Sequence, residues 1–478
     1  MRRVFTTSLV LLALVSVFSV SCAGKRKPDN KAQKGVPEAG KLYEHITCLS
    51  DPYISYALYL PVASNVSLKG YKTNPFPEKI KTWPVILAFD PHASGSLPVK
   101  KYKDLAEAYG YILLGSNNSK NGQTQIETGT ILKALMDEIR TNYPIDTSRI
   151  YLMGFSGGSR VSSLMAMFHK DIRGVIGCGA GSPGGDHRPV FRFDYFGIVG
   201  MGDFNLMEML QLDAALKDAG TRHFITTFYG PHEWPPSTVM EDAFRWIGFN
   251  AMKDGMIPVD QAVIDSFRTK KEAEITRLER QKKFLDAANG LELLISCLDG
   301  LSPPGMYINM LQRIRNTEGY QKEAKSIGSC LNREQQEQQI LMSSLISKDI
   351  SWWEMKIKTF QSGTRKGNNT EDSLMNQRIL SFLSLFLYGN ANAAMNQDDL
   401  ETSGKIIHLY ELSDPANPEP NYLNALLLMR QGDTANSMGQ LQKAIDKGFS
   451  DKVRIIQQRE FQGLGTYRPY FDLLQKMK

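Results

Sequence analysis

The sequence predicts an α/β domain built on a mostly parallel β-sheet, followed by an all-helical domain. Apolar strand-like runs alternate with helical stretches as far as residue 252. This alternation implies right-handed crossovers and a sheet that is covered on both faces. Beyond residue 258 the strand signals vanish, and long stretches rich in Leu, Lys, Glu and Gln take over. At 478 residues, the chain is long enough for about two or three domains.

The composition is typical of a folded protein and argues against a nucleic-acid partner. The net charge is only +6, and the basic residues are spread out apart from Lys25, Arg26 and Lys27. A phosphate-binding face needs a concentrated basic patch, which this distribution does not provide. The sequence also has no CxxC and no metal-ligand spacing. We therefore expect neither a metal nor a cofactor.

The first 22 residues are expected to be a targeting segment. Arg2 and Arg3 precede an apolar run over residues 9–20, and Cys22 follows it directly. This order resembles a bacterial lipoprotein signal, although Ser19 stands where leucine is commonest. The resemblance implies lipidation of Cys22, a membrane anchor and a location in the cell envelope, facing the periplasm or the exterior. The alternative is a plain cleaved secretory signal, and in either case residues 23–39 form a flexible tether.

Four cysteines remain after the targeting segment. Export permits disulfides. Cys178 lies in an apolar run and is expected to be a small core residue. Cys297 and Cys330 both lie in the helical half, and the sequence leaves open whether they pair.

The α/β domain is expected over residues 40–253. Its strand-like runs lie at residues 42–49, 55–60, 84–90, 111–115, 150–153, 175–178, 196–201 and 224–229. Helical stretches lie at residues 99–109, 129–142, 159–170, 206–219 and 241–252. No helical stretch separates the first two runs, so they are expected to form an antiparallel hairpin at one edge of the sheet.

The fifth run ends in Gly154-Phe155-Ser156-Gly157-Gly158, and helix-compatible sequence follows at once. Strand, sharp turn and helix in this order are typical of a nucleophile elbow. The serine must occupy a strained turn, and side chains at the flanking glycines would collide with the neighbouring strand and helix. The first amides of the helix then point at whatever the serine attacks, which suits a developing oxyanion.

Eight strands with the elbow after the fifth resemble the α/β-hydrolase fold. The stretches 89–95, 115–119 and 230–235 are similar to bacterial esterases near the dienelactone-hydrolase and polyhydroxybutyrate-depolymerase groups. In this fold an acid and a histidine follow the serine in the chain, at the carboxyl ends of later strands. Asp203 and His232 follow the seventh and eighth runs. The resemblance therefore implies the catalytic triad Ser156, Asp203 and His232.

Each triad partner also has a plainer interpretation. Asp203 could simply cap the following helix, and His232 could be a loop histidine stacked beside Trp234. His223 is a poorer base than His232 because it precedes the eighth strand and so lies at the wrong end of the sheet. We take Ser156, Asp203 and His232 together as the prediction.

The resemblance also implies an oxyanion hole made of two backbone amides. Gly157 is expected to supply one, and His92 the other, with Ala93 as the next choice. The side chain of His92 either contacts the substrate or is an ordinary loop residue. Ala93, Asn117 and Phe155 are the expected substrate contacts, although the loop of Asn117 could equally be a polar turn.

Only 15 residues, 181–195, separate the sixth and seventh runs. Many relatives insert a helical cap at this place. We therefore expect an open cleft suited to an exposed or bulky ester.

The helical domain is expected over residues 258–478 and shows a period near its end. Met395 and Ser403 recur as Met429 and Ser437, each 34 residues on. This period is that of tetratricopeptide repeats. Such arrays present a binding surface, so the domain either binds a protein or peptide or is a helical layer that stabilises the first domain. Trp352 and Trp353 are either a ligand platform or core residues.

Together these features predict an envelope-anchored serine hydrolase that cleaves a carboxylic ester, in a small molecule or a polymer, through an acyl-enzyme. Two alternatives stay open. One is a catalytically idle hydrolase fold that acts with the helices as a scaffold. The other is a peptidase, because the same triad serves both reactions.

Overall fold

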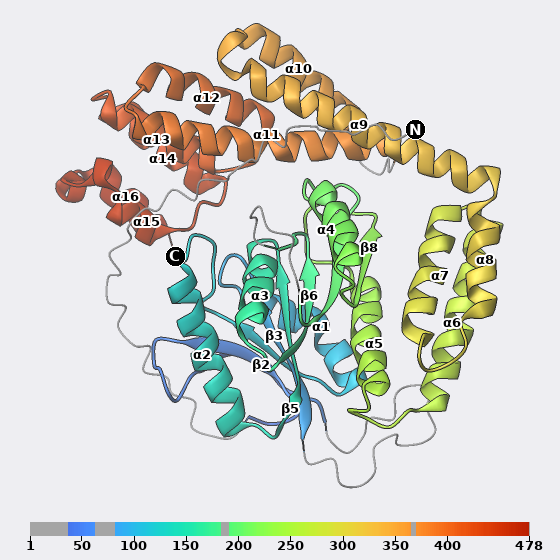
Figure 1. Ribbon diagram of the computed structural model, residues 1–478. Coiled ribbons are helices and arrows are strands. Elements are labelled where there is room, and N and C mark those ends of the chain that lie inside the picture. The colour runs from blue at the N-terminus through green and yellow to red at the C-terminus, as the bar shows by residue number, and fades with distance from the viewer. Residues whose placement is uncertain (1–36, 63–81, 183–190, 365–369, 478) are drawn as a thin grey trace. The chain divides into compact units, whose positions relative to one another are not determined.

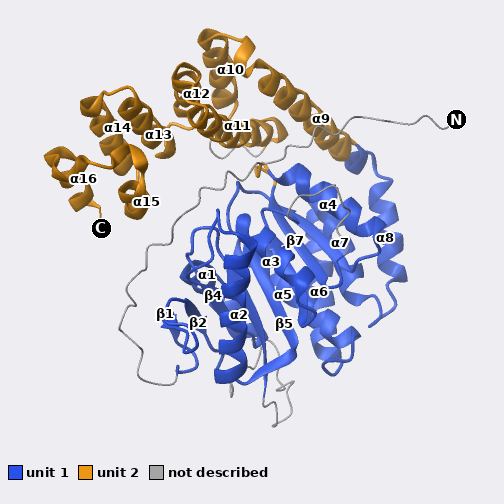
Figure 2. Cartoon of the chain, turned by 60° about the vertical axis from the view of Figure 1, so that its left-hand side comes forward, with its two compact units in different colours: residues 1–200, 205–321 blue, residues 201–204, 322–478 orange. Residues whose placement is uncertain are grey.

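The computed structural model describes residues 37–62, 82–182, 191–364 and 370–477 (Figure 1). The chain divides into two compact units (Figure 2). Unit 1 holds residues up to 200 together with 205–321, and unit 2 holds residues 322–478 together with the short segment 201–204. The expected signal, its Cys22 and most of the tether lie outside the described residues. So does most of the loop 181–195, and the open cleft stays a prediction.

Unit 1 is built on an eight-stranded sheet with the strand order β1-β2-β4-β3-β5-β6-β7-β8. Its strands are β1 (Leu42–Thr47), β2 (Ser55–Tyr59), β3 (Trp83–Phe89), β4 (Ile112–Ser116), β5 (Ile145–Phe155), β6 (Ile172–Cys178), β7 (Asp194–Gly200) and β8 (His223–Phe228). β2 is antiparallel to β1 and β4, and the remaining neighbours are parallel. The predicted mostly parallel sheet with an antiparallel hairpin at one edge is confirmed.

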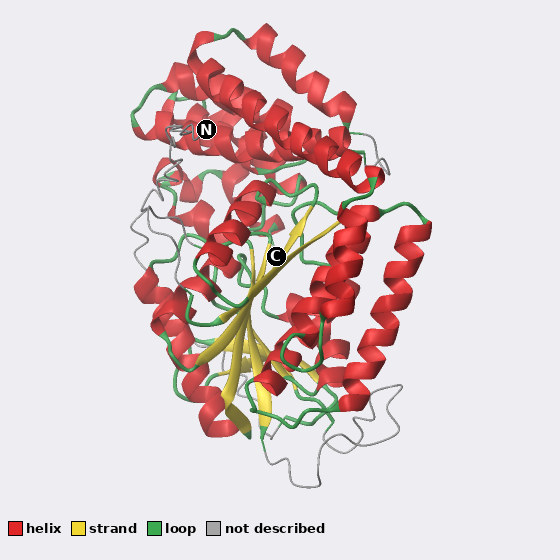
Figure 3. Ribbon diagram, turned by 45° about the vertical axis from the view of Figure 1, so that its right-hand side comes forward, coloured by secondary structure: helices red, strands yellow, loops and turns green. Residues whose placement is uncertain are grey.

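Helices cover both faces of the sheet (Figure 3). They are α1 (Ser96–Tyr109), α2 (Gln125–Asn142), α3 (Gly157–Phe168), α4 (Leu206–Asp218) and α5 (Ser237–Lys253). Alternate side chains of β5, such as Tyr151 and Met153, join one apolar cluster with residues of α1 and α5. Ile150 and Leu152 point to the opposite face and are equally buried. Burial on both faces explains why these strands are continuous apolar runs in the sequence.

Unit 1 continues beyond the boundary that the sequence suggested at residues 253–258. It includes α6 (Gln261–Arg280), α7 (Phe284–Leu298) and α8 (Gly305–Arg315). Leu291 of α7 is fully buried in the same apolar cluster as Phe196 and Phe224 of the sheet. Trp246 of α5 donates from its indole nitrogen to Ser296 Oγ at 2.8 Å. The loss of strand signals marks a change of secondary structure, whereas the hydrophobic core extends further along the chain.

Unit 2 is all-helical, as the sequence predicted. After α9 (Glu318–Ser347), which begins in unit 1, it contains α10 (Ile350–Gly363), α11 (Glu371–Asn396), α12 (Leu400–Ser413), α13 (Glu419–Arg430), α14 (Thr434–Asp446), α15 (Lys452–Gln457) and α16 (Arg468–Lys476). Trp353 is fully buried in the apolar cluster of this unit, with Trp352 packed against it. Trp353 is therefore a core residue.

The 34-residue period of the sequence corresponds to a repeated local geometry. Asp399 caps α12 and Asp433 caps α14, and each side chain accepts a hydrogen bond from the amide three residues on. The residues just before these caps, Asp398 and Gly432, both have positive φ, at 58° and 82°. The repeat is thus two helix pairs joined by the same tight turn, while its likeness to tetratricopeptide repeats stays a prediction.

Cys48, Cys178, Cys297 and Cys330 are all buried free thiols. Cys178 is fully buried in the core of the sheet, as predicted. Over the described ranges, no helix is long and apolar enough to cross a membrane.

The substitution Leu291→Ala tests whether α7 belongs to the core of unit 1. Removing a buried leucine side chain should lower the local unfolding free energy of β7 and β8 by about 2–5 kcal/mol. Hydrogen–deuterium exchange of these strands measures this change. Leu387→Ala, the same substitution in the apolar cluster of unit 2, should leave them unchanged. Equal effects of the two variants on β7 and β8 would contradict the assignment.

Candidate active site

Ser156 lies in a strained turn between β5 and α3. Its backbone has φ 52° and ψ −120°, a conformation that non-glycine residues rarely adopt. A Cβ on Gly154 would lie 2.1 Å from the carbonyl oxygen of Gly158, and one on Gly158 would lie 2.0 Å from that of Phe89. Both positions therefore require glycine, and the elbow geometry that the sequence predicted is present.

His232 lies against the nucleophile. Its Nε2 is 2.9 Å from Ser156 Oγ. Phe155 packs against the imidazole, with the ring centroids 4.6 Å apart, and on Trp234 at 5.5 Å. Phe155, expected to be a substrate contact, is only 8% exposed, and its contacts are those of a support for the histidine ring.

The loop that carries His232 is held in place by hydrogen bonds to two parts of the chain, the end of β3 and α1. Trp234 Nε1 donates to Asp90 Oδ2 at 2.9 Å, directly after β3. Lys101 Nζ and Tyr102 Oη, both of α1, donate to the carbonyls of Trp234 and Pro235 at 2.9 and 2.7 Å. Sequence reasoning missed these supports. Asp90 lies in the stretch 89–95, which the sequence analysis singled out, but its partner Trp234 is 144 residues away.

The loop after β3 packs directly against the end of β4. A Cβ built on Gly115 would lie only 2.0 Å from the carbonyl oxygen of Gly95. Within this loop the amide of His92 donates to Asp90 Oδ1 at 2.9 Å. His92, the first choice for the second oxyanion donor, is thus committed to an internal hydrogen bond. Ala93 has φ 59° and donates to the Asp90 carbonyl over a longer 3.3 Å.

Asp90 is a buried carboxylate, 2% exposed. Burial acts to raise its pKa, but the hydrogen bonds from His92 and Trp234 outweigh burial and hold the pKa below its ordinary value. His92 Nδ1 lies 3.7 Å from Asp90 Oδ1. The nearby carboxylate raises the pKa of His92. As an ionised carboxylate, Asp90 therefore connects the loop after β3, through His92, with the loop that carries His232, through Trp234.

The remaining predicted residues lie as follows. Gly157 is the first residue of α3. The first amides of a helix have no preceding turn to donate to, so the Gly157 amide has no acceptor within the helix. Asp203 is 1% exposed and lies three residues beyond the end of β7. Asn117 donates from its side chain to the carbonyl of Glu44 at 3.1 Å, which ties its loop to β1. Asn121 was not selected from the sequence, but its side chain packs against Gly157, the residue after the nucleophile. A Cβ built on Gly157 would lie only 1.8 Å from Asn121 Oδ1.

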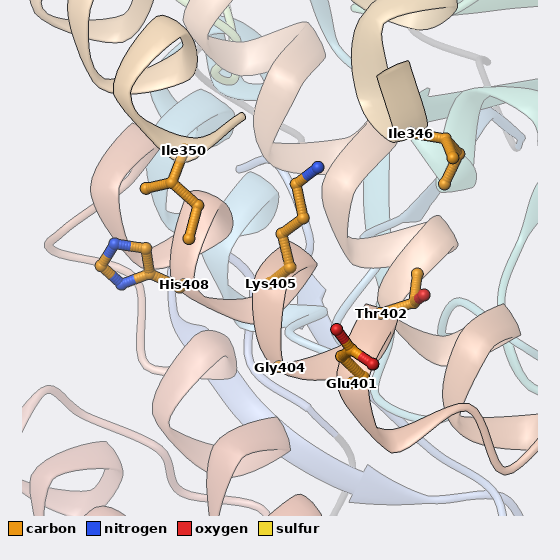
Figure 4. A pocket seen from close by; sticks show the side chains of 7 residues that line it. All are labelled: Ile346, Ile350, Glu401, Thr402, Gly404, Lys405 and His408. Carbon is orange, nitrogen blue, oxygen red and sulfur yellow. The ribbon is translucent and has the colours of Figure 1, made fainter. Parts of the chain in front are cut away.

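A separate hollow of about 510 Å³ lies within unit 2, and Figure 4 shows the side chains around it. It is lined by Ile346, Ile350, Glu401, Thr402, Gly404, Lys405 and His408. None of these residues was expected to carry the reaction. In the part of the chain that the structure describes, no group of three His, Cys, Asp or Glu side chains could hold a metal ion.

No family model matches the sequence, and no curated protein matches it. Similar solved structures include an S-formylglutathione hydrolase from Staphylococcus aureus, with 13% identity and a TM-score of 0.35 over 45% of this chain and 99% of that one. A fluorophosphonate-binding serine hydrolase from the same bacterium has 12% identity and a TM-score of 0.32, over 43% and 96% of the two chains. A ferulic acid esterase has 15% identity and a TM-score of 0.29, over 41% of this chain and 91% of that one.

Unit 1 has the α/β-hydrolase fold. This assignment follows from its own geometry: a mostly parallel eight-stranded sheet, an antiparallel β2, and a serine at positive φ between β5 and α3.

The substitution Gly158→Ala tests the close packing at the elbow. The new methyl group would collide with the Phe89 carbonyl, and we expect a loss of about 1–3 kcal/mol in unfolding free energy. Denaturant titration measures the change. Gly129→Ala in α2 is the matched control. Nothing lies within 4 Å of a Cβ there, and alanine is the better helix former, so a gain of about 0.5–1 kcal/mol is expected. A neutral Gly158→Ala would rule out the packing described.

The substitution Asp90→Asn tests the buried carboxylate. An amide offers only one oxygen to the two donors, so we expect a loss of about 1–3 kcal/mol at neutral pH. Because the pKa of Asp90 is lowered in the folded state, its charge-dependent stabilisation is present above the unfolded pKa of about 3.9 and is lost as the pH falls through the folded value. The difference in unfolding free energy between parent and variant should therefore be constant above about pH 5 and shrink below about pH 4. A difference that does not vary with pH would show that folding leaves the pKa of Asp90 unshifted, and one that shrinks as the pH rises above about 4 would show that the buried carboxyl is neutral.

Proposed function

We propose that this protein is a serine hydrolase that cleaves a carboxylic ester through an acyl-enzyme. The observation that carries the proposal is the 2.9 Å contact between Ser156 Oγ and His232 Nε2, made by a serine held at φ 52°. A serine hydroxyl is a weak nucleophile until an adjacent base accepts its proton. A strained nucleophile in contact with such a base favours the enzyme over the idle scaffold, because a scaffold needs neither feature.

In this mechanism His232 removes the proton of Ser156 while Oγ attacks the ester carbonyl. The resulting tetrahedral intermediate collapses when His232 returns the proton to the leaving alcohol. Water then attacks the acyl-enzyme by the same route, with His232 again as the base. Phe155 packs on the imidazole and restricts its rotation between the two steps.

Asp203 is the proposed acid of the triad, which orients His232 and stabilises its charged form. β7 and β8 are parallel neighbours, and Gly200 is paired with Phe228 at their carboxyl ends. A Cβ on Gly200 would lie 2.4 Å from the carbonyl oxygen of Gly230 and 2.5 Å from that of Pro231. The backbone segments that lead from β7 to Asp203 and from β8 to His232 therefore begin next to each other. This placement supports Asp203 as the partner of His232.

The amide of Gly157 is the first proposed oxyanion donor. For the second, Ala93 is the better candidate because the His92 amide is held by Asp90, whereas the Ala93 amide makes only a long internal bond. Two such donors stabilise the negative charge that develops on the carbonyl oxygen.

Labelling with a fluorophosphonate, together with turnover of short-chain p-nitrophenyl esters, tests the proposal. The parent chain should label and turn over, and Ser156→Ala should abolish both. The control is Ser163→Ala, in the helix α3 that follows Ser156. The Oγ of Ser163 is buried without a hydrogen-bond partner, so this variant should fold and label like the parent. A folded parent that neither labels nor turns over any ester would refute the hydrolase proposal and favour a scaffold.

The substitution Asp203→Asn should lower kcat by about 10⁴-fold, because an amide favours the wrong tautomer of the histidine. KM should change little. A loss below tenfold would exclude Asp203 as the acid of the triad.

A further inference from the structure

Unit 2 contains a buried ion pair between α9 and α11. Arg378 of α11 donates from Nε to Glu334 Oε2 at 2.7 Å, and its Nη2 lies 2.6 Å from the same oxygen. Both side chains are only 2% exposed. Burial acts to raise the pKa of Glu334, while the adjacent guanidinium opposes this shift. A buried pair of this kind costs desolvation energy, so it is weak evidence for a purely stabilising role.

The same guanidinium reaches the chain that follows β7. Arg378 Nη1 donates to the carbonyl oxygen of Met201, the first residue after β7. Asp203 follows two residues later, and the segment 201–204 is grouped with the helices as part of unit 2 (Figure 2). A charged donor makes a stronger hydrogen bond to a carbonyl than a neutral donor. The backbone that leads to the proposed acid is thus held by the guanidinium of Arg378.

The geometry of the guanidinium makes this bond directional. Its nitrogens form a rigid planar fork. Glu334 engages Nε and Nη2, which fixes the plane of the fork and therefore the direction in which Nη1 points. Glu334 orients the donor, and Arg378 orients the backbone.

We propose that Arg378, oriented by Glu334, is a positioning residue for Asp203 and acts by fixing the backbone of the segment 201–204. This inference rests on the proposed function, since it assigns Arg378 a role through the acid of the triad.

The chain contains a matched case without the connection to the acid. Arg430 pairs with Glu460 through Nε at 2.7 Å and Nη2 at 2.6 Å, and its Nη1 donates to the carbonyl of Met395. The residue types, these three bonds and the unit are the same, although Arg430 is 26% exposed and its Nη1 also lies 3.6 Å from Asp398 Oδ1. Met395, however, lies in α11, so this arginine holds a helix end in place of the segment 201–204.

The test compares two double variants of the full chain. Removing Arg378 alone would leave Glu334 buried and unpaired, so both partners are replaced by apolar residues of similar volume, which often preserves stability. We expect Arg378→Met with Glu334→Leu to lower kcat by about 10²-fold, the size of effect that a 1 Å misplacement produces. KM should change less than threefold. Arg430→Met with Glu460→Leu should keep both constants within about threefold of the parent.

Hydrogen–deuterium exchange gives a second readout that does not depend on activity. Peptides that cover residues 201–204 should exchange at least tenfold faster in the Arg378 and Glu334 variant and at the parental rate in the control. Arg378→Lys should give an intermediate kcat, because lysine keeps the charge but not the planar fork.

The outcomes separate this inference from the proposed function. If the parent turns over ester but the Arg378 and Glu334 variant keeps its kcat, or if residues 201–204 exchange at the parental rate, the positioning role is wrong and the hydrolase stands. Equal losses of kcat in the two double variants would also overturn it, because they would point to general destabilisation of unit 2. A parent without activity, together with unchanged exchange in the variant, would overturn both proposals.

Discussion

The candidate site depends on direct contact between backbones at the carboxyl edge of the sheet. Gly158 lies against the Phe89 carbonyl, Gly115 against Gly95, and Gly200 against Gly230 and Pro231. At each of these contacts a Cβ would lie 2.0–2.5 Å from a carbonyl oxygen, so only glycine is accommodated. These contacts bring the elbow, the loop after β3 and the histidine loop close enough for their polar groups to interact.

Side chains then set the orientation of these loops. Asp90 accepts from the His92 amide and from the indole of Trp234, so a single buried carboxylate joins two loops that carry different parts of the site. Phe155 fills the space between Trp234 and His232. A shift of one loop would therefore be transmitted to the others through rigid contacts, as is usual in densely packed interiors.

The sequence predicted the sheet, its antiparallel edge and the elbow because these depend on local patterns. Parallel strands buried on both faces are continuous apolar runs, and the turn at Ser156 needs glycines at fixed spacing. His232 could be selected because it alone follows the eighth strand at the required place. The support of Trp234 by Asp90 was not predictable, because the two residues are 144 positions apart and no periodicity connects them. The hydrogen bonds of the His92 amide and the Asn117 side chain were not predictable for a related reason, since loop hydrogen bonds depend on conformations that composition does not encode. The inclusion of α7 in unit 1 was missed because its apolar face is compatible with packing on either helices or a sheet.

The bond between Arg378 and Met201 joins residues that lie 177 positions apart in the chain. Because a ribosome makes Met201 long before Arg378, the Met201 carbonyl must remain without this donor while the intervening helices are synthesised. Contacts of such long sequence separation form late in folding, after the local structure of each domain. A newly made chain would therefore complete its sheet and its serine–histidine pair first and acquire the support for the segment of Asp203 last. The proposed hydrolase activity would then appear only at the end of folding and would report that the whole chain, helices included, has reached its native state.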